Sequence, residues 1–582
     1  MHTIFQVMAK FNKLMVKGFF IATLMFFSVM QVLHADTNDT LPQYINPIKG
    51  NLKLSGSFGE LRSGHFHTGI DIKSNNTYAG DSIFCIANGW VSRIKIDRVG
   101  YGIAVYVDHP ETGHTSLYAH LSATNPEIDS IIFNLQKQLK SWELDVFFEK
   151  DKIPLGAGEL IGFLGNTGYS LGPHLHFEIR DTKSEKVLNP FLFGIKPTDT
   201  RSPIALSMDI YGLDYSLQVI DRQTKYSPKN KNSGVLNFGT ITVPAYRAGI
   251  GVQCFDLMNG ASNYNGIYRL EMKVDGNVEY VAQFDTLEFD YAKQINAYID
   301  YHSKIEKDRS VSCCYKKPGN QLSLITTATS QGLVNLYPDR ARNVEVNISD
   351  IEGNKTTINL KLVAANTIKH YEGQFQKFLK CKVDTTFISQ NWQFHFPKEA
   401  LAIDLPFNFK MSRINDEDIY QICEESTPLL CNIEGVIPVQ EHINFDKSKV
   451  RLVRIEKEGL ADYGSEIIDS TLRVSLAKFG NYKFFVDTIA PVIKKVEFPK
   501  KSKTGMIFKF EISDKPFAKN KGKDIHYNIY VDDQWYPGAF KDLTHSLTID
   551  TRRMDIGIHK LRIEVTDGVG NVSEYEGSFE LY

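Results

Sequence analysis

The sequence predicts a mainly β protein, with an N-terminal β domain that carries one helical insertion, followed by β-sandwich modules. Strand patterns dominate the chain. Residues 344–348 and 561–566 alternate apolar and polar side chains, which is the pattern of a strand with one buried face. Helical periodicity is convincing only from Pro126 to about Lys150, where apolar residues recur three or four positions apart at Ile128, Ile131, Ile132, Leu135 and Leu139.

A repeated pair of motifs indicates that one sandwich module occurs twice. The turns Asp350-x-x-Gly353-Asn354 and Asp567-x-x-Gly570-Asn571 follow the two alternating strands, and each leads into a further strand. Upstream, Asp199-Thr200-x-x-Pro203-Ile204 matches Asp487-Thr488-x-x-Pro491-Val492. We interpret these motifs as marking the first and last strands of two copies of one module.

The motifs divide the second part of the chain into three predicted domains. These are a β-sandwich module with an insertion at 199–365, a β-rich module at 366–486 and a sandwich at 487–582. The last has the length and turn spacing of an immunoglobulin-like sandwich. Within 366–486, the segments 392–396 and 482–486 have the pattern of strands.

Composition excludes two classes of protein. Of the 582 residues, 42% are hydrophobic and 23% charged, which excludes wholesale disorder. Lys and Arg number 66 against 68 Asp and Glu, giving a net charge of −2, and no basic stripe is visible. Because phosphate recognition needs a concentrated positive field, we expect no nucleic-acid partner.

The first 35 residues predict a secretory signal peptide. Lys10, Lys13 and Lys17 precede an apolar run at 18–33, which is short for a membrane-spanning helix, and Leu33-His34-Ala35 follows before Asp36. We therefore expect an exported protein of the periplasm or cell envelope. A membrane partner is expected only if this leader stays uncleaved as an anchor.

The cysteines show no pattern that predicts a chemical role. Seven cysteines cannot all pair, and no Cys-x-x-Cys spacing indicates a zinc or redox motif. We expect mainly buried free thiols, with Cys423–Cys431 as one bridge that the spacing allows.

Three histidine-containing segments point to a site in the N-terminal domain. In His174-Leu-His176-Phe-Glu178-Ile, the alternation places two imidazoles on one face of a strand and the apolar residues in a core. His67 and Asp71 are separated by three residues, and Tyr118-Ala-His120-Leu supplies another imidazole. Imidazole and carboxylate are preferred zinc ligands, and catalytic zinc takes three protein ligands and leaves a position for water. Each segment alone is a weak signal, since a surface or core histidine is the more common explanation.

In combination and in order, these segments resemble the lysostaphin/LytM-type zinc metallopeptidases, a family of peptidoglycan-cleaving endopeptidases with a duplicated-hybrid-motif β fold. The elements that carry the resemblance are the His-x-x-x-Asp, Tyr-Ala-His-Leu and Gly-Pro-His-Leu-His-Phe-Glu motifs, with Phe58-Gly59 before them. The resemblance covers about residues 48–195. It implies one Zn²⁺ per chain and peptidoglycan as the substrate.

The resemblance also implies the roles of the five groups. His67, Asp71 and His176 would bind zinc, and His120 and His174 would be catalytic, moving protons or stabilising the oxyanion without ligating. Chemistry supports this division, since five bound groups would leave no place for water. We expect His65 to play no part, although it is a possible alternate ligand. We expect His109 and His114 to be solvated beside a polar turn.

Two features stay open at this stage. Glu178 lies on the histidine face and either orients an imidazole or has no functional role. The segment 122–153 separates motifs that are close together in the family, and its helix either covers the cleft, docks a partner or packs on the flank of its own domain.

The sequence therefore predicts an exported zinc metalloendopeptidase that cleaves amide bonds in peptidoglycan peptides or cross-links. The alternative is a catalytically silent or masked peptidoglycan-binding factor that activates another cell-wall hydrolase. The modules at 199–582 would be accessory, with a protein or glycan partner that no motif names.

Overall fold

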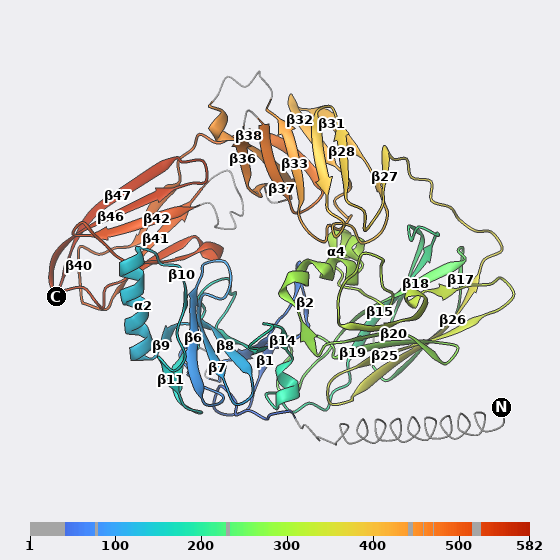
Figure 1. The fold of residues 1–582 in the computed structure, drawn as a ribbon, viewed down its shortest axis with the longest axis horizontal. Helices are drawn as coiled ribbons and strands as arrows, with labels where there is room; N and C mark the ends of the chain where they lie inside the picture. The colour runs from blue at the N-terminus through green and yellow to red at the C-terminus, as the bar shows by residue number, and fades with distance from the viewer. Residues whose placement is uncertain are drawn as a thin grey trace, which may run out of the picture. The chain divides into compact units, whose positions relative to one another are not determined.

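The computed structural model describes residues 41–75, 79–228, 233–439, 446–457, 459–468, 471–514 and 525–582. The predicted signal peptide lies outside the described residues. The structure is mainly β with few helices, as predicted (Figure 1). Among the helices of the described ranges, none combines the length and apolar character needed to cross a membrane.

An antiparallel sheet in the N-terminal part carries the candidate site. Its strand order is β1 (Leu54–Gly56), β4 (Ile70–Lys73), β13 (His174–Asp181), β8 (His114–Leu121), β7 (Ile103–His109), β6 (Gly89–Ile96) and β10 (Leu144–Phe147). A small second sheet contains β5 (Ser82–Phe84), β12 (Leu160–Phe163) and β9 (Ala123–Thr124). The alternation in β13 buries Leu175, Phe177 and Ile179 in the core, as predicted. The register then sets His176 opposite Asp71 on β4 and opposite Ala119 on β8.

The predicted helical insertion is shorter than the sequence pattern indicates. Helix α2 spans Pro126–Leu139, with Asn125 as its N-cap, and it ends at Lys140, which has a left-handed φ of 48°. Our extension to about Lys150 is therefore wrong. Residues 144–147 form β10, because their alternating side chains pair with β6 and complete the sheet edge.

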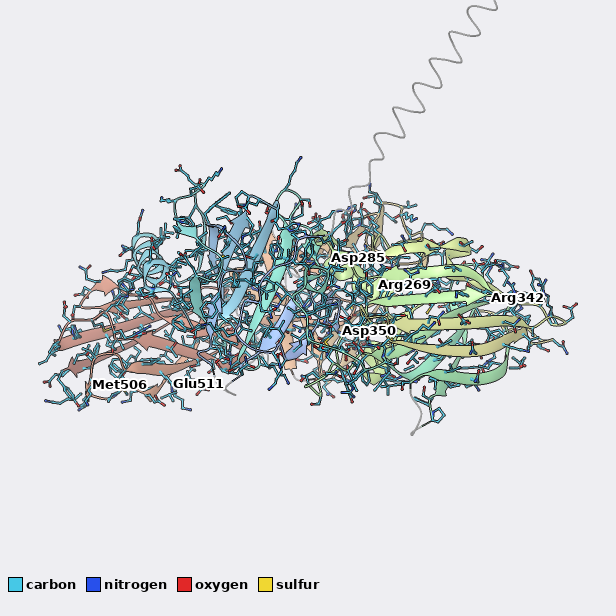
Figure 2. All side chains as sticks on the ribbon, turned by 90° about the horizontal axis from the view of Figure 1, so that it is seen from below. Arg269, Asp285, Arg342, Asp350, Met506 and Glu511 are labelled. Carbon is cyan, nitrogen blue, oxygen red and sulfur yellow. The ribbon has the colours of Figure 1, made fainter. Side chains whose placement is uncertain are left out.

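The next module contains two facing sheets. One includes β15 (Ile204–Leu213) and β18 (Arg247–Phe255); the other includes β19 (Arg269–Val274), β25 (Arg342–Ser349) and β26 (Lys355–Ala364). Strands β25 and β26 flank the Asp350 turn, as the repeat predicts. Figure 2 shows Arg342 and Asp350 at opposite ends of this sheet. One continuous hydrophobic core runs from Ile48 to Ala364, so the N-terminal domain and this module share a packed interior.

Two further pairs of sheets follow. The described residues of 376–486 form a two-stranded sheet and two five-stranded sheets. The larger sheets include β29 (Trp392–Phe396) and β38 (Gly480–Val486), which confirms both predicted strands. The last module pairs a sheet containing β39 (Val492–Glu497) and β41 (Ile507–Ser513) with one containing β46 (Gly557–Thr566) and β47 (Val572–Leu581). The domain boundaries and the immunoglobulin-like identity stay predictions. All seven cysteines are free thiols, including Cys423 and Cys431.

Candidate metal centre

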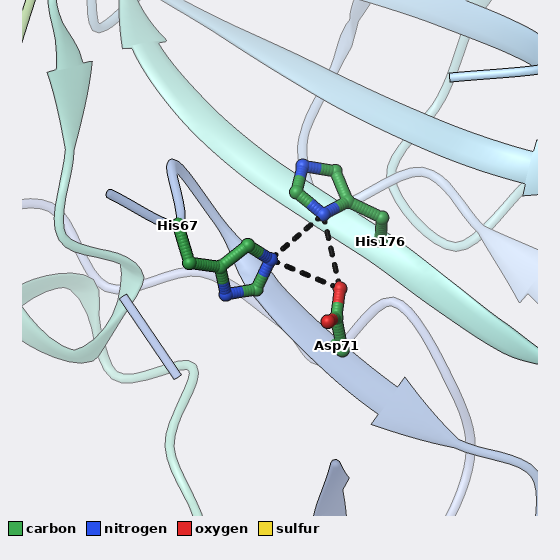
Figure 3. Close-up of side chains that lie close together, drawn as sticks. All are labelled: His67, Asp71 and His176. Carbon is green, nitrogen blue, oxygen red and sulfur yellow. Dashed lines mark hydrogen bonds and ion pairs between the residues drawn. The ribbon is translucent and has the colours of Figure 1, made fainter. Parts of the chain in front are cut away.

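Three side chains from separate elements converge on one point in the N-terminal domain. His67 follows the short strand β3 (His65–Phe66), Asp71 lies on β4 and His176 on β13 (Figure 3). His67 Nε2 is 3.0 Å from His176 Nδ1 and 3.1 Å from Asp71 Oδ1, and His176 Nδ1 is 3.0 Å from the same oxygen. All three side chains are buried. The two nitrogens and one oxygen are therefore close enough to share one cation.

Each of these donors is oriented by a partner on its other side. His67 Nδ1 donates to the Ser57 carbonyl at 2.8 Å, and His176 Nε2 donates to Glu178 Oε1 at 2.9 Å. With its outer nitrogen protonated, a neutral imidazole directs the lone pair of the other nitrogen to the centre. Asp71 Oδ2 accepts from the Arg62 guanidinium, which leaves Oδ1 for the centre. The fold thus fixes both tautomers and one carboxylate orientation.

The electrostatics of the centre favour a positive charge. Burial lowers the pKa of His67 to about 4, so this ring is neutral at neutral pH. Burial would lower the pKa of His176, but hydrogen bonds to Asp71 and Glu178 raise it to about 9. Burial would raise the pKa of Asp71, but the neighbouring histidines hold it well below its usual range. A proton on His176 thus occupies the place that a metal ion would take. Two imidazoles and a carboxylate are a zinc donor set, so the residues present fit Zn²⁺.

Two more imidazoles stand beside the three donors. The ring centroids of His120 and His174 are 4.7 Å apart, and His174 Nε2 is 3.4 Å from Asp71 Oδ1. His120 Nδ1 donates to the Thr167 carbonyl at 2.9 Å, and His174 Nδ1 donates to the Gly172 carbonyl at 2.8 Å. All five predicted residues therefore lie in one cluster.

His120 is held in an unusual state. Its φ is 58°, in the left-handed region that non-glycine residues seldom adopt, and such strained positions cluster at functional sites. Burial and the neighbouring rings of His174 and His176 lower the pKa of His120 to about 3. The ring is therefore neutral at neutral pH, with Nε2 as the acceptor nitrogen.

The structure adds a buried network that the sequence analysis did not identify. Glu178 is fully buried and accepts hydrogen bonds from Thr68, Tyr101 and Arg180 in addition to His176. Glu178 contacts the His176 imidazole directly, which favours a role in orienting that ring over no functional role. Arg180 could have been predicted, because the period of two along β13 places it on the same face as His176 and Glu178. The hydrogen bonds from Thr68 and Tyr101 to Glu178 have no local sequence signal.

The other histidines of this region lie outside the cluster. His65 is exposed and its Nδ1 contacts the Ser63 carbonyl, so it is not part of the donor group. Our prediction that His109 is solvated is wrong, because it is buried with its ring nitrogens 3.0 Å from the Asn88 carbonyl and 2.8 Å from Ser116 Oγ. His114 is half-buried against the Tyr44 hydroxyl, 2.7 Å away.

Helix α2 packs against two surfaces. Ile128 and Ile132 join the core of their own domain. On another face, the ring of Phe133 lies 6.1 Å from that of Tyr536, and Asp129 forms a 2.5 Å ion pair with Arg553. The insertion therefore packs on its own flank and also docks the last module.

Comparison with known proteins matches two regions of the chain. The family model described as a Zu5-like domain matches residues 376–487. The DD-carboxypeptidase/endopeptidase Mpg of Neisseria meningitidis is 33% identical over 133 residues, which are 22% of this chain and 24% of that protein. Lysostaphin of Staphylococcus simulans is 26% identical over 149 residues, covering 25% of this chain and 24% of lysostaphin. The chain thus spans about a quarter of the length of these curated relatives.

Among solved structures, the catalytic domain of lysostaphin from Staphylococcus simulans matches 24% of this chain and 91% of that chain, with 24% identity and a TM-score of 0.19. The family of this domain is assigned from the relatives in sequence. About a quarter of the chain is a peptidase domain. That domain belongs to the M23/lysostaphin family.

Proposed function

We propose that this protein is an exported zinc endopeptidase that hydrolyses amide bonds in the peptide part of bacterial peptidoglycan. The observation that carries the proposal is the convergence of His67 Nε2, His176 Nδ1 and Asp71 Oδ1 within 3.1 Å of one another. The substrate class comes from the likeness to Mpg and lysostaphin, and export and a periplasmic or envelope location follow from a wall substrate.

The residues of the chain support a division of labour. His67, Asp71 and His176 would hold Zn²⁺, which when bound activates water and polarises a carbonyl. His120 donates a hydrogen bond from Nδ1 to the Thr167 carbonyl, so Nε2 is the nitrogen that would take a proton from the attacking water and return it to the leaving amine.

His174 would stabilise the negative charge that develops on the carbonyl oxygen during the reaction. Its Nδ1 donates to the Gly172 carbonyl, and its Nε2 lies 3.4 Å from Asp71 Oδ1, so Nε2 faces the cluster. Only the imidazolium form of His174 carries a proton on both ring nitrogens, and in that form its Nε2–H could donate to the oxyanion of the tetrahedral intermediate. The two histidines could perform these two jobs jointly, and we propose His120 as the base and His174 as the oxyanion donor.

Metal content and wall digestion together test the proposal. We expect wild type to contain one zinc by elemental analysis and to release soluble peptides from purified cell walls of defined cross-link chemistry. His67→Ala should lose both, because two remaining donors bind zinc poorly, whereas His120→Ala should keep zinc and lose activity. His65→Ala is the matched control and should keep both. A folded, zinc-loaded wild type that digests no wall type would favour the alternative of a binding factor that activates another hydrolase.

The modules after the peptidase domain would be accessory to this activity. We propose that the last one is an immunoglobulin-like sandwich and that these modules position the enzyme on the wall through a protein or glycan ligand. The two-sheet architecture supports this proposal. Sedimentation of the inactive His120→Ala chain with purified walls would test it, and a chain that stays in the supernatant would contradict wall binding.

A further inference from the structure

We propose that Asp199, Asp256 and Asp350 form a Ca²⁺ site in the first sandwich module, separate from the zinc centre. One carboxylate oxygen from each residue lies within 4.8 Å of the others. Asp199 precedes β15, Asp256 follows β18, and Asp350 begins the turn between β25 and β26. Three segments far apart in the sequence thus place acidic side chains at one end of the module (Figure 2 labels Asp350).

One oxygen in this cluster lacks a partner. Asp256 is 1% exposed, and within the described part of the chain its Oδ1 has no hydrogen-bond partner. An unpaired buried carboxylate oxygen is costly unless a cation or donor satisfies it. A cavity of about 20 Å³ lies at this place and is lined by all three aspartates, which is room for one ion.

The charges of the cluster also call for a cation. Burial and the carboxylates of Asp199 and Asp350 raise the pKa of Asp256 to about 8. Asp350 cannot turn away, because its Oδ1 accepts from the Asn354 backbone N–H at 2.9 Å and its Oδ2 from the Asn354 amide at 2.7 Å. The turn therefore holds a carboxylate against two others.

The donor chemistry selects Ca²⁺ over zinc. All three donors are carboxylate oxygens, which hard cations prefer, and no histidine or cysteine belongs to the group. Ca²⁺ binds oxygen at about 2.3–2.6 Å, so oxygens on one ion lie up to about 5 Å apart. The observed spacing is within this limit.

The site is connected to the zinc centre by three short contacts. Asp256 and Asn265 pair through both backbone groups at 2.9 Å. The next residue, Gly266, donates its N–H to Ser57 Oγ at 2.8 Å, and the Ser57 carbonyl accepts from His67 Nδ1. A cation that orders the segment 256–266 would therefore steady the residue that orients His67.

The last module repeats the arrangement. Asp487, Asp514 and Asp567 form a second group with the same spacing, and Asp567 is held by Asn571 as Asp350 is held by Asn354. Two modules that share the Asp-Thr-x-x-Pro and Asp-x-x-Gly-Asn motifs thus each bring three aspartates together. The proposal is made for the first triad, where the unpaired oxygen and the cavity lie.

Calcium binding to the zinc-loaded full chain tests the proposal. We expect isothermal titration with CaCl₂ to give a Kd on the order of 10⁻⁴ to 10⁻³ M, as in other extracellular modules, and a rise of a few °C in the unfolding temperature at saturating calcium. Asp256→Asn keeps the shape of the side chain and relieves the crowding of charge. We therefore expect it to lose one bound Ca²⁺ and to unfold at an unchanged or higher temperature in calcium-free buffer.

Asp339→Asn is the matched control, because Asp339 is an exposed acid of the same module, and it should bind calcium like wild type. If wild type binds two ions, Asp256→Asn should bind one. The proposal is overturned if wild type binds no calcium at 10 mM, or if Asp256→Asn binds as many ions as wild type with the same affinity. It is also overturned if Asp339→Asn loses the same ion.

Discussion

At the scale of single residues, the candidate metal centre depends on which ring nitrogen of His67 and of His176 carries the proton. His67 and His176 each donate from the outer nitrogen to an oxygen, at the Ser57 carbonyl and at Glu178. These acceptors favour the tautomer in which the other nitrogen faces the centre, so we expect them to influence metal affinity without contacting the ion.

Replacing Glu178 with glutamine tests this indirect control. Glutamine keeps a carbonyl oxygen for His176 Nε2 but removes the charge that makes the ring a stronger donor. We expect the zinc Kd to weaken by about 10- to 100-fold, measured by competition with a chromophoric chelator. Glu111→Gln, an exposed acid of the same domain, should bind zinc like wild type. Unchanged zinc affinity in folded Glu178→Gln would show that the contact is only structural.

The sequence predicts the five clustered residues but not their supports. His174 and His176 are visible because period two places them on one strand face, and their motifs occur in order. Arg62, Thr68 and Tyr101 reach the cluster through tertiary contacts. Residues of these types are common on any surface, so no local pattern distinguishes them.

At the scale of elements, the insertion shows how a sheet edge overrides a helical pattern. The apolar spacing of 128–139 continues weakly to 150, but Lys140 adopts a left-handed conformation and residues 144–147 pair with β6. Their backbone groups pair with those of β6, so this edge of the sheet gains hydrogen-bond partners that a longer helix would not supply. The sequence therefore predicts the existence and start of α2, whereas its end depends on tertiary pairing.

The packing of α2 on its own domain can be measured. Ile128 is fully buried in the core, so Ile128→Ala should lower the free energy of unfolding by about 2–4 kcal/mol, from lost transfer energy and the cavity left behind. Ile131 lies one turn further along α2 and is half-buried, so Ile131→Ala should lower the free energy of unfolding by less than half as much. Urea unfolding followed by tryptophan fluorescence measures both, and equal losses would contradict the assigned face.

A second element, helix α4 (Tyr301–Lys307), is joined to its sheet through its N-cap. Asp300 caps the helix, and its carboxylate also contacts Arg222 on β16 (Val219–Tyr226) and the Tyr211 hydroxyl on β15. Although burial opposes it, the Arg222 charge and the Ser303 hydroxyl lower the pKa of Asp300 below its usual value. The folded state therefore favours the ionised form.

This shift predicts the pH dependence of stability. Because the folded-state pKa of Asp300 is lowered, its contribution is complete above about pH 4 and is lost as pH falls through the folded-state value. We expect Asp300→Asn to be less stable than wild type at pH 7 and the difference to shrink toward pH 3, measured by urea midpoints. Asp308→Asn, at the exposed C-cap, is the control. A difference that does not change with pH would contradict a role for the charge.

At the scale of the whole molecule, the last module contacts two loops that frame the candidate site. Arg98 donates to the Ile525 carbonyl at 3.0 Å, and Lys541 Nζ donates to the Asn166 carbonyl at 2.8 Å. Asn166 precedes Thr167, whose carbonyl holds His120. These contacts join residues 427 and 375 positions apart, so neither strand pattern nor motif spacing could predict them.

We predict from the Lys541 contact that this module positions a loop of the proposed catalytic site. Without the ammonium, the loop at 165–168 loses a restraint one residue from the acceptor that fixes the His120 tautomer. We expect Lys541→Met to lower kcat on wall peptides several-fold while KM and zinc content stay as in wild type, and Lys541→Arg to restore part of kcat. Lys560→Met, on the exposed side of the same module, should not change kcat. Because a purely structural contact would alter stability without separating kcat from KM, a fall in the unfolding temperature with unchanged kcat would show that this module acts only as a support.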